Sequence, residues 1–301
     1  MKFIAGINSS GMRILFILLL AFPNCSVFAQ PQKSKTPATP KPFVLGTIEE
    51  IYSAELGEMR TLNIYVPPSY NAKDATTYPV VYLLDGSADE DFIHVVGLYQ
   101  FNSFPWVRRA PESIIVGIAN IDRKRDFTFP STVASEKKNF PTTGGSEKFM
   151  NFLGKELQPY MQKKYKTNSS KTIIGESLGG LLATEILLKR PAMFTKYIII
   201  SPGVWWDGGS LLNYKSQKLN AAFSQPTEVY IGVGKEGLTP SEPPRVMEVD
   251  ANVLADKIRN INCKNMVVHF DYLPDESHAT IAHHALFNAL ELLYPATDAG
   301  K

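Results

Sequence analysis

Apolar and β-branched residues recur along the chain in two patterns, and each pattern predicts a different kind of β-strand. Residues 48–54 and 59–66 are short β-branched or aromatic runs on either side of Gly57, which is typical of an antiparallel hairpin. Later runs are almost continuously apolar, as expected of parallel strands covered on both faces. These runs are residues 80–84, 114–119, 172–174, 197–200, 229–233 and 266–270.

Helical patterns lie between several of these runs. Residues 146–165, 246–261 and 281–293 carry apolar side chains at three- and four-residue spacings, which indicates amphipathic helices. Strands that alternate with helices predict an α/β fold with a mostly parallel, doubly wound sheet of about eight strands. In such a sheet the reactive groups gather at the carboxyl ends of the strands.

The two ends of the chain differ in composition from the rest. Residues 1–29 combine Lys2 and Arg13 with an apolar run and end in Val27-Phe28-Ala29, which predicts a signal peptide cleaved after Ala29. Residues 30–42 are rich in Pro, Lys, Ser and Thr and are typical of a flexible linker. One domain is expected over residues 43–295, with a tail at 296–301. The protein is therefore expected to be periplasmic or secreted, without a stable membrane span.

Charge and cysteine content argue against a nucleic-acid partner and against an intrachain disulfide. The 31 basic and 29 acidic residues give a formal net charge of +2, which is too small a field to indicate nucleic acid. Cleavage after Ala29 would leave Cys263 as the one cysteine, so no intrachain disulfide is expected. A lipid anchor on Cys25 is the alternative, and Pro23 and Asn24 before it fit such a site poorly. No Cys/His spacing predicts a metal site, and no cofactor is expected.

A candidate nucleophile follows the third of the apolar runs. Gly175-Glu176-Ser177-Leu178-Gly179 is a G-x-S-x-G motif between a predicted strand and a predicted helix, the context of a nucleophile elbow. Glycines at both ends would remove side chains that collide in so tight a turn. The Leu178 amide at the helix start would face a developing oxyanion. A serine that only caps the helix is the alternative interpretation.

A serine nucleophile needs a base, and in this architecture the histidine comes last in the chain. His278 lies in the loop after the last predicted strand and is the candidate. His283 and His284 fall inside the following helix, where packing or surface roles are more common. No metal site is predicted from them.

The acid and the second oxyanion donor are less constrained. Glu236 follows the predicted strand 229–233 and is the first choice for the acid; Asp250 is the second, and a Ser-His dyad completed by water or a backbone carbonyl stays open. Gly86, in the loop after residues 80–84, is the candidate for the second oxyanion amide, with Ser87 as its neighbour. An ordinary Asp-Gly turn explains that loop equally well.

Several ordered motifs now resemble a known family. The motifs lie at residues 82–86, 116–118, 123–128, 175–180, 201–206 and 276–278, and they resemble the putative esterase family of α/β-hydrolases. That family includes esterase D, feruloyl and acetyl-xylan esterases, mycolyltransferases and siderophore esterases, and the match spans residues 48–294. The resemblance implies Ser177 as nucleophile, His278 as base and an acid near Glu236. Three prolines in residues 237–246 depart from the pattern and suggest a longer acid loop.

Two pairs of side chains bring the chain nearest to the siderophore-esterase branch. Arg123 and Arg125 could meet an anionic or catecholate group, although an ion pair with Asp122 or Asp126 is the commoner arrangement. Trp205 and Trp206 could wall an aromatic or sugar substrate, although core packing explains at least one of them equally well.

These observations together predict an exported serine esterase that acts through an acyl-serine intermediate on a small-molecule, carbohydrate or siderophore ester. An acyltransferase with the same residues is the main alternative. A peptidase and a non-catalytic exported binding protein with the hydrolase fold are the others, and a binding protein would have no need of Ser177, His278 and the elbow glycines. The oligomeric state does not follow from the sequence.

Overall fold

A single mixed sheet organises the part of the chain that the computed structural model describes, residues 40–295. The signal peptide predicted at residues 1–29, nearly all of the predicted linker and the tail at 296–301 lie outside these residues. Eight strands follow the order β1-β2-β4-β3-β5-β6-β7-β8. Their bounds are β1 Thr47–Ser53, β2 Glu58–Tyr65, β3 Tyr78–Leu83, β4 Ile114–Ile118, β5 Thr167–Glu176, β6 Lys196–Ile200, β7 Thr227–Gly234 and β8 Met266–Leu273. From Val44 onward the described chain belongs to one compact unit.

The pairing of the strands confirms the predicted fold class. β1 pairs with β2 and β2 with β4 in antiparallel fashion, whereas all other neighbours are parallel. Along β3, Val80 and Tyr82 belong to the apolar cluster on one face, and Val81 and Leu83 belong to the cluster on the other. This alternation explains why the central strands are apolar at every position.

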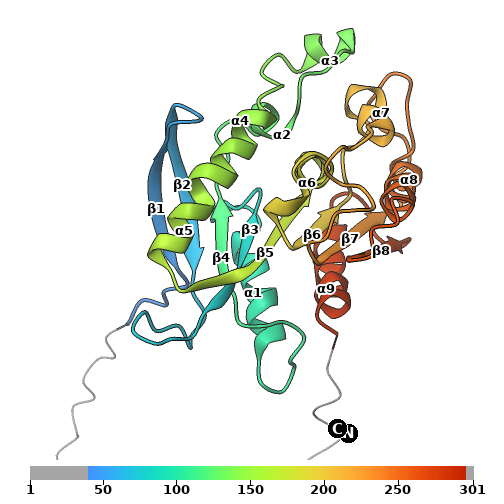
Figure 1. The fold of residues 1–301 in the computed structure, drawn as a ribbon. Coiled ribbons are helices and arrows are strands. Elements are labelled where there is room, and N and C mark those ends of the chain that lie inside the picture. Colours follow the sequence, from blue (N-terminus) through green and yellow to red (C-terminus); the bar gives the residue numbers. More distant parts are fainter. Residues whose placement is uncertain (1–39, 296–301) are drawn as a thin grey trace, which may run out of the picture. The chain divides into compact units, whose positions relative to one another are not determined.

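Helices cover both faces of the sheet (Figure 1). Their bounds are α1 Phe92–Ser103, α2 Arg123–Phe127, α3 Ala134–Asn139, α4 Ser146–Asn151, α5 Gln158–Lys164, α6 Leu178–Lys189, α7 Trp206–Asn213, α8 Met247–Arg259 and α9 Ile281–Leu293. Buried side chains of α1 and α9 pack against one face, and those of α4, α5, α6 and α8 pack against the other. The carboxyl ends of the parallel strands are left to the loops that carry the candidate site.

Several helical segments differ from the sequence prediction: the short helices α2, α3 and α7 were not predicted, and two further differences have a clear physical reason. Residues 146–164 form a helical segment as expected, but its middle, Phe152–Leu157, is π-helical. Pro159 lies just beyond this turn and has no amide hydrogen to donate, so a regular α-helical ladder cannot continue through it. The helix α1 was not predicted, because its apolar residues surround it and leave no polar stripe to reveal a helical period.

A buried ion pair joins the hairpin to the helices. Arg60 on β2 donates to Asp126 on α2 at 2.7 Å, and the two side chains are 0% and 1% exposed. The Arg60 guanidinium also lies 5.3 Å from the centre of the Phe149 ring. Arg60 also contacts Glu58 at 2.9 Å, but the Glu58 side chain is partly exposed, and Asp126 is the carboxylate that shares the buried environment of Arg60. A buried charge that loses such a partner is destabilising, because little water can solvate it.

We therefore expect Asp126→Ala to lower the free energy of unfolding by about 3–5 kcal/mol, measured by urea denaturation. The matched control is Asp256→Ala, which breaks the exposed Asp256–Arg259 pair and should cost less than about 1 kcal/mol. Equal losses in the two variants would contradict the role assigned to the buried pair.

Candidate active site

Ser177 occupies the turn between β5 and α6, and its backbone is held in a strained conformation. Its φ of 56° and ψ of −115° lie outside the regions that residues with a side chain usually adopt. The Ser177 amide donates to Ile200 O at 3.0 Å, and the Gly203 amide donates to Ser177 O at 2.9 Å. These bonds fix the turn against the end of β6, so Ser177 lies at the carboxyl edge of the sheet.

The glycines of the motif differ in how much the turn depends on them. A Cβ on Gly175 would lie 2.4 Å from the backbone of Gly179, and a Cβ on Gly180 would lie 2.9 Å from Ile200 O. Neither position can hold a side chain unless the backbone moves. A Cβ on Gly179 would have its nearest neighbour at 3.3 Å, so the turn depends less on this glycine than the G-x-S-x-G pattern predicts.

The loops after β7 and β8 bring an acid and a histidine together. Parallel pairing aligns Gly234 with Leu273, and the Lys235 amide then donates to Glu276 O at 2.8 Å. A Cβ on Gly234 would lie 2.6 Å from Glu276 O, so this glycine permits the close approach of the two loops. As a result Glu236 Oε2 lies 2.5 Å from His278 Nδ1.

The acid is fixed from its other side as well. The Ser201 hydroxyl and the Gly234 amide both donate to Glu236 Oε1, the amide at 3.2 Å. The Glu236 side chain is only 2% exposed, whereas that of His278 is 47% exposed. A carboxylate held in this way can orient the imidazole and stabilise its protonated form. No hydrogen bond joins Ser177 to His278 within residues 40–295, and such bonds commonly tighten only when substrate binds.

The contact between Glu236 and His278 shifts both pKa values toward the charged forms. Burial raises the pKa of Glu236, but hydrogen bonds from His278 and Ser201 outweigh burial and hold it below its ordinary value. The hydrogen bond to Glu236 raises the pKa of His278 above 6.5, and burial opposes that rise only in part. The imidazole is therefore a stronger base than a free histidine.

Asp250, the second choice for the acid, has a different partner. It lies on α8 and accepts two hydrogen bonds from Arg245, at 2.6 and 2.7 Å. This contact ties the start of α8 to the preceding loop, so Asp250 makes no bond with His278.

The assignment of the Gly86 amide to the oxyanion hole is wrong. That amide donates to Ile118 O at 3.0 Å and is not free to meet an oxyanion. A Cβ on Gly86 would lie 2.4 Å from Gly117 Cα, so glycine is needed there for close contact with β4. The neighbouring Ser87 amide has only a long contact of 3.3 Å with Glu90. The Leu178 amide lies in the first turn of α6 and has no acceptor among the described residues.

The two arginines have different surroundings. Arg125 donates to Glu58 through both terminal nitrogens and to Asp126 through Nε, which is the ion-pair arrangement given as its alternative to a contact with substrate. Arg123 pairs instead with Asp85, from Nε at 2.6 Å and from Nη2 at 3.0 Å. Its Nη2 also donates to Glu176 O at 3.2 Å, which places this guanidinium beside the elbow.

The two tryptophans also separate into a core residue and a candidate. Trp206 is 1% exposed and donates its indole N–H to Phe129 O at 2.8 Å, so it cannot wall a substrate. Trp205 is half-buried and lies two residues after Gly203, whose amide donates to Ser177 O. Only Trp205 therefore stays a candidate for contact with substrate.

Two polar residues beside the elbow were not identified from the sequence as part of the site. Ser201 directly follows β6 with a φ of 44° and supports Glu236. Asp85 lies two residues after the end of β3 with a φ of 53° and holds Arg123. A polar residue placed just after a buried parallel strand was the available signal. Positive φ at a non-glycine residue, which marks both positions, is not visible in a sequence.

The remaining histidines form separate contacts. His283 Nδ1 lies 2.8 Å from His94 Nε2 on α1, and His284 Nδ1 contacts Glu276. Among residues 40–295 no three His, Cys, Asp or Glu side chains are grouped so that they could hold a metal ion.

Glu176, the residue before Ser177, carries a strongly perturbed carboxyl group. Burial raises its pKa to about 7, with repulsion from Asp91 adding to the rise. The folded protein therefore holds this proton up to about pH 7, whereas an ordinary glutamate releases it near 4.5. Stability is consequently lost as the pH rises through this window.

We expect Glu176→Gln to be more stable than the wild type at pH 8.5, by on the order of 2 kcal/mol after allowance for solvent screening. The gap should be much smaller at pH 5, where the wild-type carboxyl is protonated in the folded state. Urea unfolding of both proteins at the two pH values measures this, and parallel pH dependence would contradict it.

An elbow serine and a histidine paired with a carboxylate, all on loops at the carboxyl edge of such a sheet, are the arrangement of the serine hydrolases of the α/β-hydrolase fold. The family model described as Putative esterase matches residues 53–271. The chain belongs to this family, and it is an ester hydrolase.

Comparison with individual proteins agrees with this assignment. The ferri-bacillibactin esterase BesA of Bacillus subtilis (strain 168) is 28% identical over 218 residues, which are 65% of this chain and 73% of that protein. Among solved structures, an IroE-like serine hydrolase from Shewanella oneidensis is 30% identical with a TM-score of 0.73, covering 84% of this chain and 82% of that one. The BES protein from Bacillus cereus is 26% identical with a TM-score of 0.69, covering 87% and 100%.

Within residues 40–295 no helix combines the length and the apolar character that crossing a membrane requires.

Proposed function

We propose that the protein is an exported siderophore esterase in which Ser177 is the nucleophile, His278 the general base and Glu236 the acid. The observation that carries the proposal is the placement of a strained serine elbow and a carboxylate-bound histidine on loops at the same edge of one sheet. Signal cleavage after Ala29 and a periplasmic or secreted location are part of the proposal, argued from the sequence of residues 1–29.

The reaction has two steps with balanced proton transfers. His278 takes the proton of the Ser177 hydroxyl as Oγ attacks the ester carbonyl, and the same proton is then given to the leaving alcohol. Water next attacks the acyl-serine and gives a proton to His278; as the C–Oγ bond breaks, His278 returns that proton to Ser177 Oγ and the carboxylic acid product is released. The Leu178 amide is proposed to donate to the oxyanion, with the Ser87 amide as the second donor in place of Gly86.

The substrate class rests on relatives and on two side chains. One relative is named a ferri-bacillibactin esterase, and the motifs around Arg123 and Trp205 resemble the siderophore-esterase branch, which supports a siderophore ester as substrate. Arg123 is one-third exposed beside the elbow, and its Nη1 is not used by Asp85. A cation beside the elbow and a half-buried indole two residues after Gly203, whose amide binds Ser177 O, suit an acidic aromatic acyl group.

The test compares three esters on the purified protein: a catecholate trilactone siderophore with and without iron, a feruloyl sugar ester and p-nitrophenyl butyrate. We expect kcat/KM for the siderophore to exceed that for the other two by about tenfold or more, through contacts to the acyl group that the small ester lacks. Chromatography of the products identifies the bond cleaved. A preference for the feruloyl ester would move the substrate to the carbohydrate class, and transfer of the acyl group to an added alcohol would indicate an acyltransferase.

A further inference from the structure

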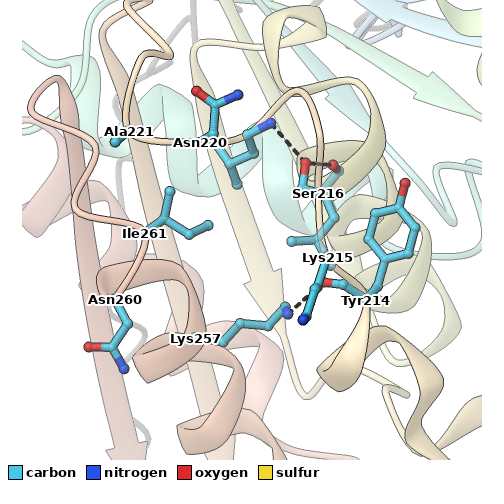
Figure 2. A pocket seen from close by; sticks show the side chains of 10 residues that line it. Tyr214, Lys215, Ser216, Asn220, Ala221, Lys257, Asn260 and Ile261 are labelled. Atoms are coloured by element: carbon cyan, nitrogen blue, oxygen red, sulfur yellow. Dashed lines mark hydrogen bonds between the residues drawn. The ribbon is translucent and has the colours of Figure 1, made fainter.

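Two adjoining hollows lie away from the edge of the sheet that carries Ser177. The first, of about 320 Å³, lies between α8 and the chain that follows α7, and Tyr214 and Lys257 border it (Figure 2). The second, of about 940 Å³, lies beside the last turn of α6 and the early part of β5 and also includes Tyr214. Since Ser177 follows the carboxyl end of β5, these hollows are far from the ester-cleaving machinery. We call the two together the basic groove.

The basic groove is rich in lysines without an acidic partner. Within residues 40–295 four of its lysines, Lys171, Lys215, Lys218 and Lys257, form no ion pair. Lys257 Nζ instead donates to Tyr214 O at 2.6 Å, a contact drawn in Figure 2, and Lys171 Nζ donates to Gln158 Oε1 at 2.9 Å. Both acceptors are neutral, so the positive charges stay uncompensated.

Two other cations of the basic groove do have acidic partners. Lys189 is paired with the buried Glu185, and Arg190 is paired with Glu147. Pairing with carboxylates is thus available at this edge of the sheet, and four lysines lack it. Burial lowers the pKa of Lys171 and of Lys257, which means that each ammonium group would be stabilised by an anion brought to it.

The four lysines are spread over both hollows, so a ligand that contacts all of them must be elongated. Lys215 and Lys257 border the first hollow, Lys171 and Lys218 border the second, and Tyr214 stands between the hollows with 36% of its surface exposed. A ligand that meets both pairs must carry more than one anionic group along its length. The amides of Asn220 and Asn260 at the first hollow add neutral hydrogen-bonding groups.

We propose that the basic groove binds an anionic polysaccharide, with its acidic groups against the lysines, a sugar ring on Tyr214 and sugar hydroxyls on the amides of Asn220 and Asn260. A lipid bilayer is flat and would not reach lysines that line hollows. A nucleic acid would bring one charge for each nucleotide and would favour a far more basic protein than one of net charge +2. The proposal is independent of the proposed siderophore substrate.

The test uses an oligogalacturonate, a chain of uronic acids, as the probe in isothermal titration calorimetry. We expect binding at 50 mM NaCl that weakens by about tenfold or more at 500 mM, since salt screens exposed charges. The double variant Lys215→Gln/Lys218→Gln should bind at least about tenfold more weakly, because two of the four point charges are lost. Neither side chain forms an ion pair or a side-chain hydrogen bond within residues 40–295, and neither is buried, so the fold should be kept, and thermal unfolding checks this.

The matched controls separate the groove from charge in general. Lys73→Gln removes an exposed lysine from another part of the chain and should bind like the wild type, as should Ser177→Ala. Tyr214→Ala should weaken binding without changing its salt dependence. The proposal is overturned if no binding is seen, if Lys73→Gln weakens binding as much as the double variant, or if a neutral galacto-oligosaccharide, a polyphosphate or anionic phospholipid vesicles bind as tightly as the oligogalacturonate.

Discussion

Replacing Ser177 with alanine is expected to lower kcat for p-nitrophenyl butyrate by about 10⁶-fold, because the acyl-enzyme can no longer form. His278→Ala should lower kcat by a similar factor, and the double variant should be little worse than either single variant. This non-additivity is expected because the hydroxyl and the imidazole act as one unit, so losing either removes the same step. Steady-state kinetics with saturating ester measures all three.

A fluorophosphonate probe followed by peptide mass spectrometry gives the second measurement for Ser177. The label should be found on Ser177 in the wild type and should be absent from Ser177→Ala. Ser169→Ala is the matched control, because Ser169 is exposed on the same strand but near its amino end. It should keep both labelling and turnover. A wild-type protein that is neither labelled nor active would favour the binding-protein interpretation.

The fold followed from the sequence because its main signal is local. Strands covered on both faces must be apolar at every position, and runs such as residues 229–233 therefore identify themselves without knowledge of their neighbours. The helix α1 could not be identified in this way, because apolar residues lie all around it and hide the helical period of its sequence. The order of strands in the sheet, which places β4 between β2 and β3, depends on pairing between distant segments and was not predicted.

For the site, too, the positions that depend on the order of strands along the chain were predicted, whereas the hydrogen-bond partners that depend on packing were not. Ser177, Glu236 and His278 were located because each follows a particular strand, and the carboxyl ends of parallel strands meet. The errors concern partners. Whether the Gly86 amide is free depends on Ile118, and whether Arg125 is free depends on Glu58, a residue 67 positions away. Such pairings come from packing and leave no mark on the local sequence.

Replacing Glu236 with glutamine is expected to lower kcat by about 10⁴-fold while leaving the fold intact. The reason lies in the donors around the acid. The Ser201 hydroxyl and the Gly234 amide would keep the side-chain oxygen of the glutamine on their side, which turns its NH₂ toward His278 Nδ1. An N–H facing Nδ1 forces the imidazole proton onto the other nitrogen, so the base can no longer accept a proton from Ser177.

The same variant should also move the pH dependence. In the wild type kcat/KM should rise with pH through the pKa of His278, which the hydrogen bond to Glu236 raises above 6.5. With that hydrogen bond and charge removed, the midpoint of the residual activity should shift to lower pH. Glu276→Gln is the matched control, since Glu276 makes a comparable contact with the exposed His284, and its rate should stay within about twofold of the wild type. A residual rate whose midpoint does not move would show that Glu236 does not set the basicity of His278, and would favour a dyad of Ser177 and His278.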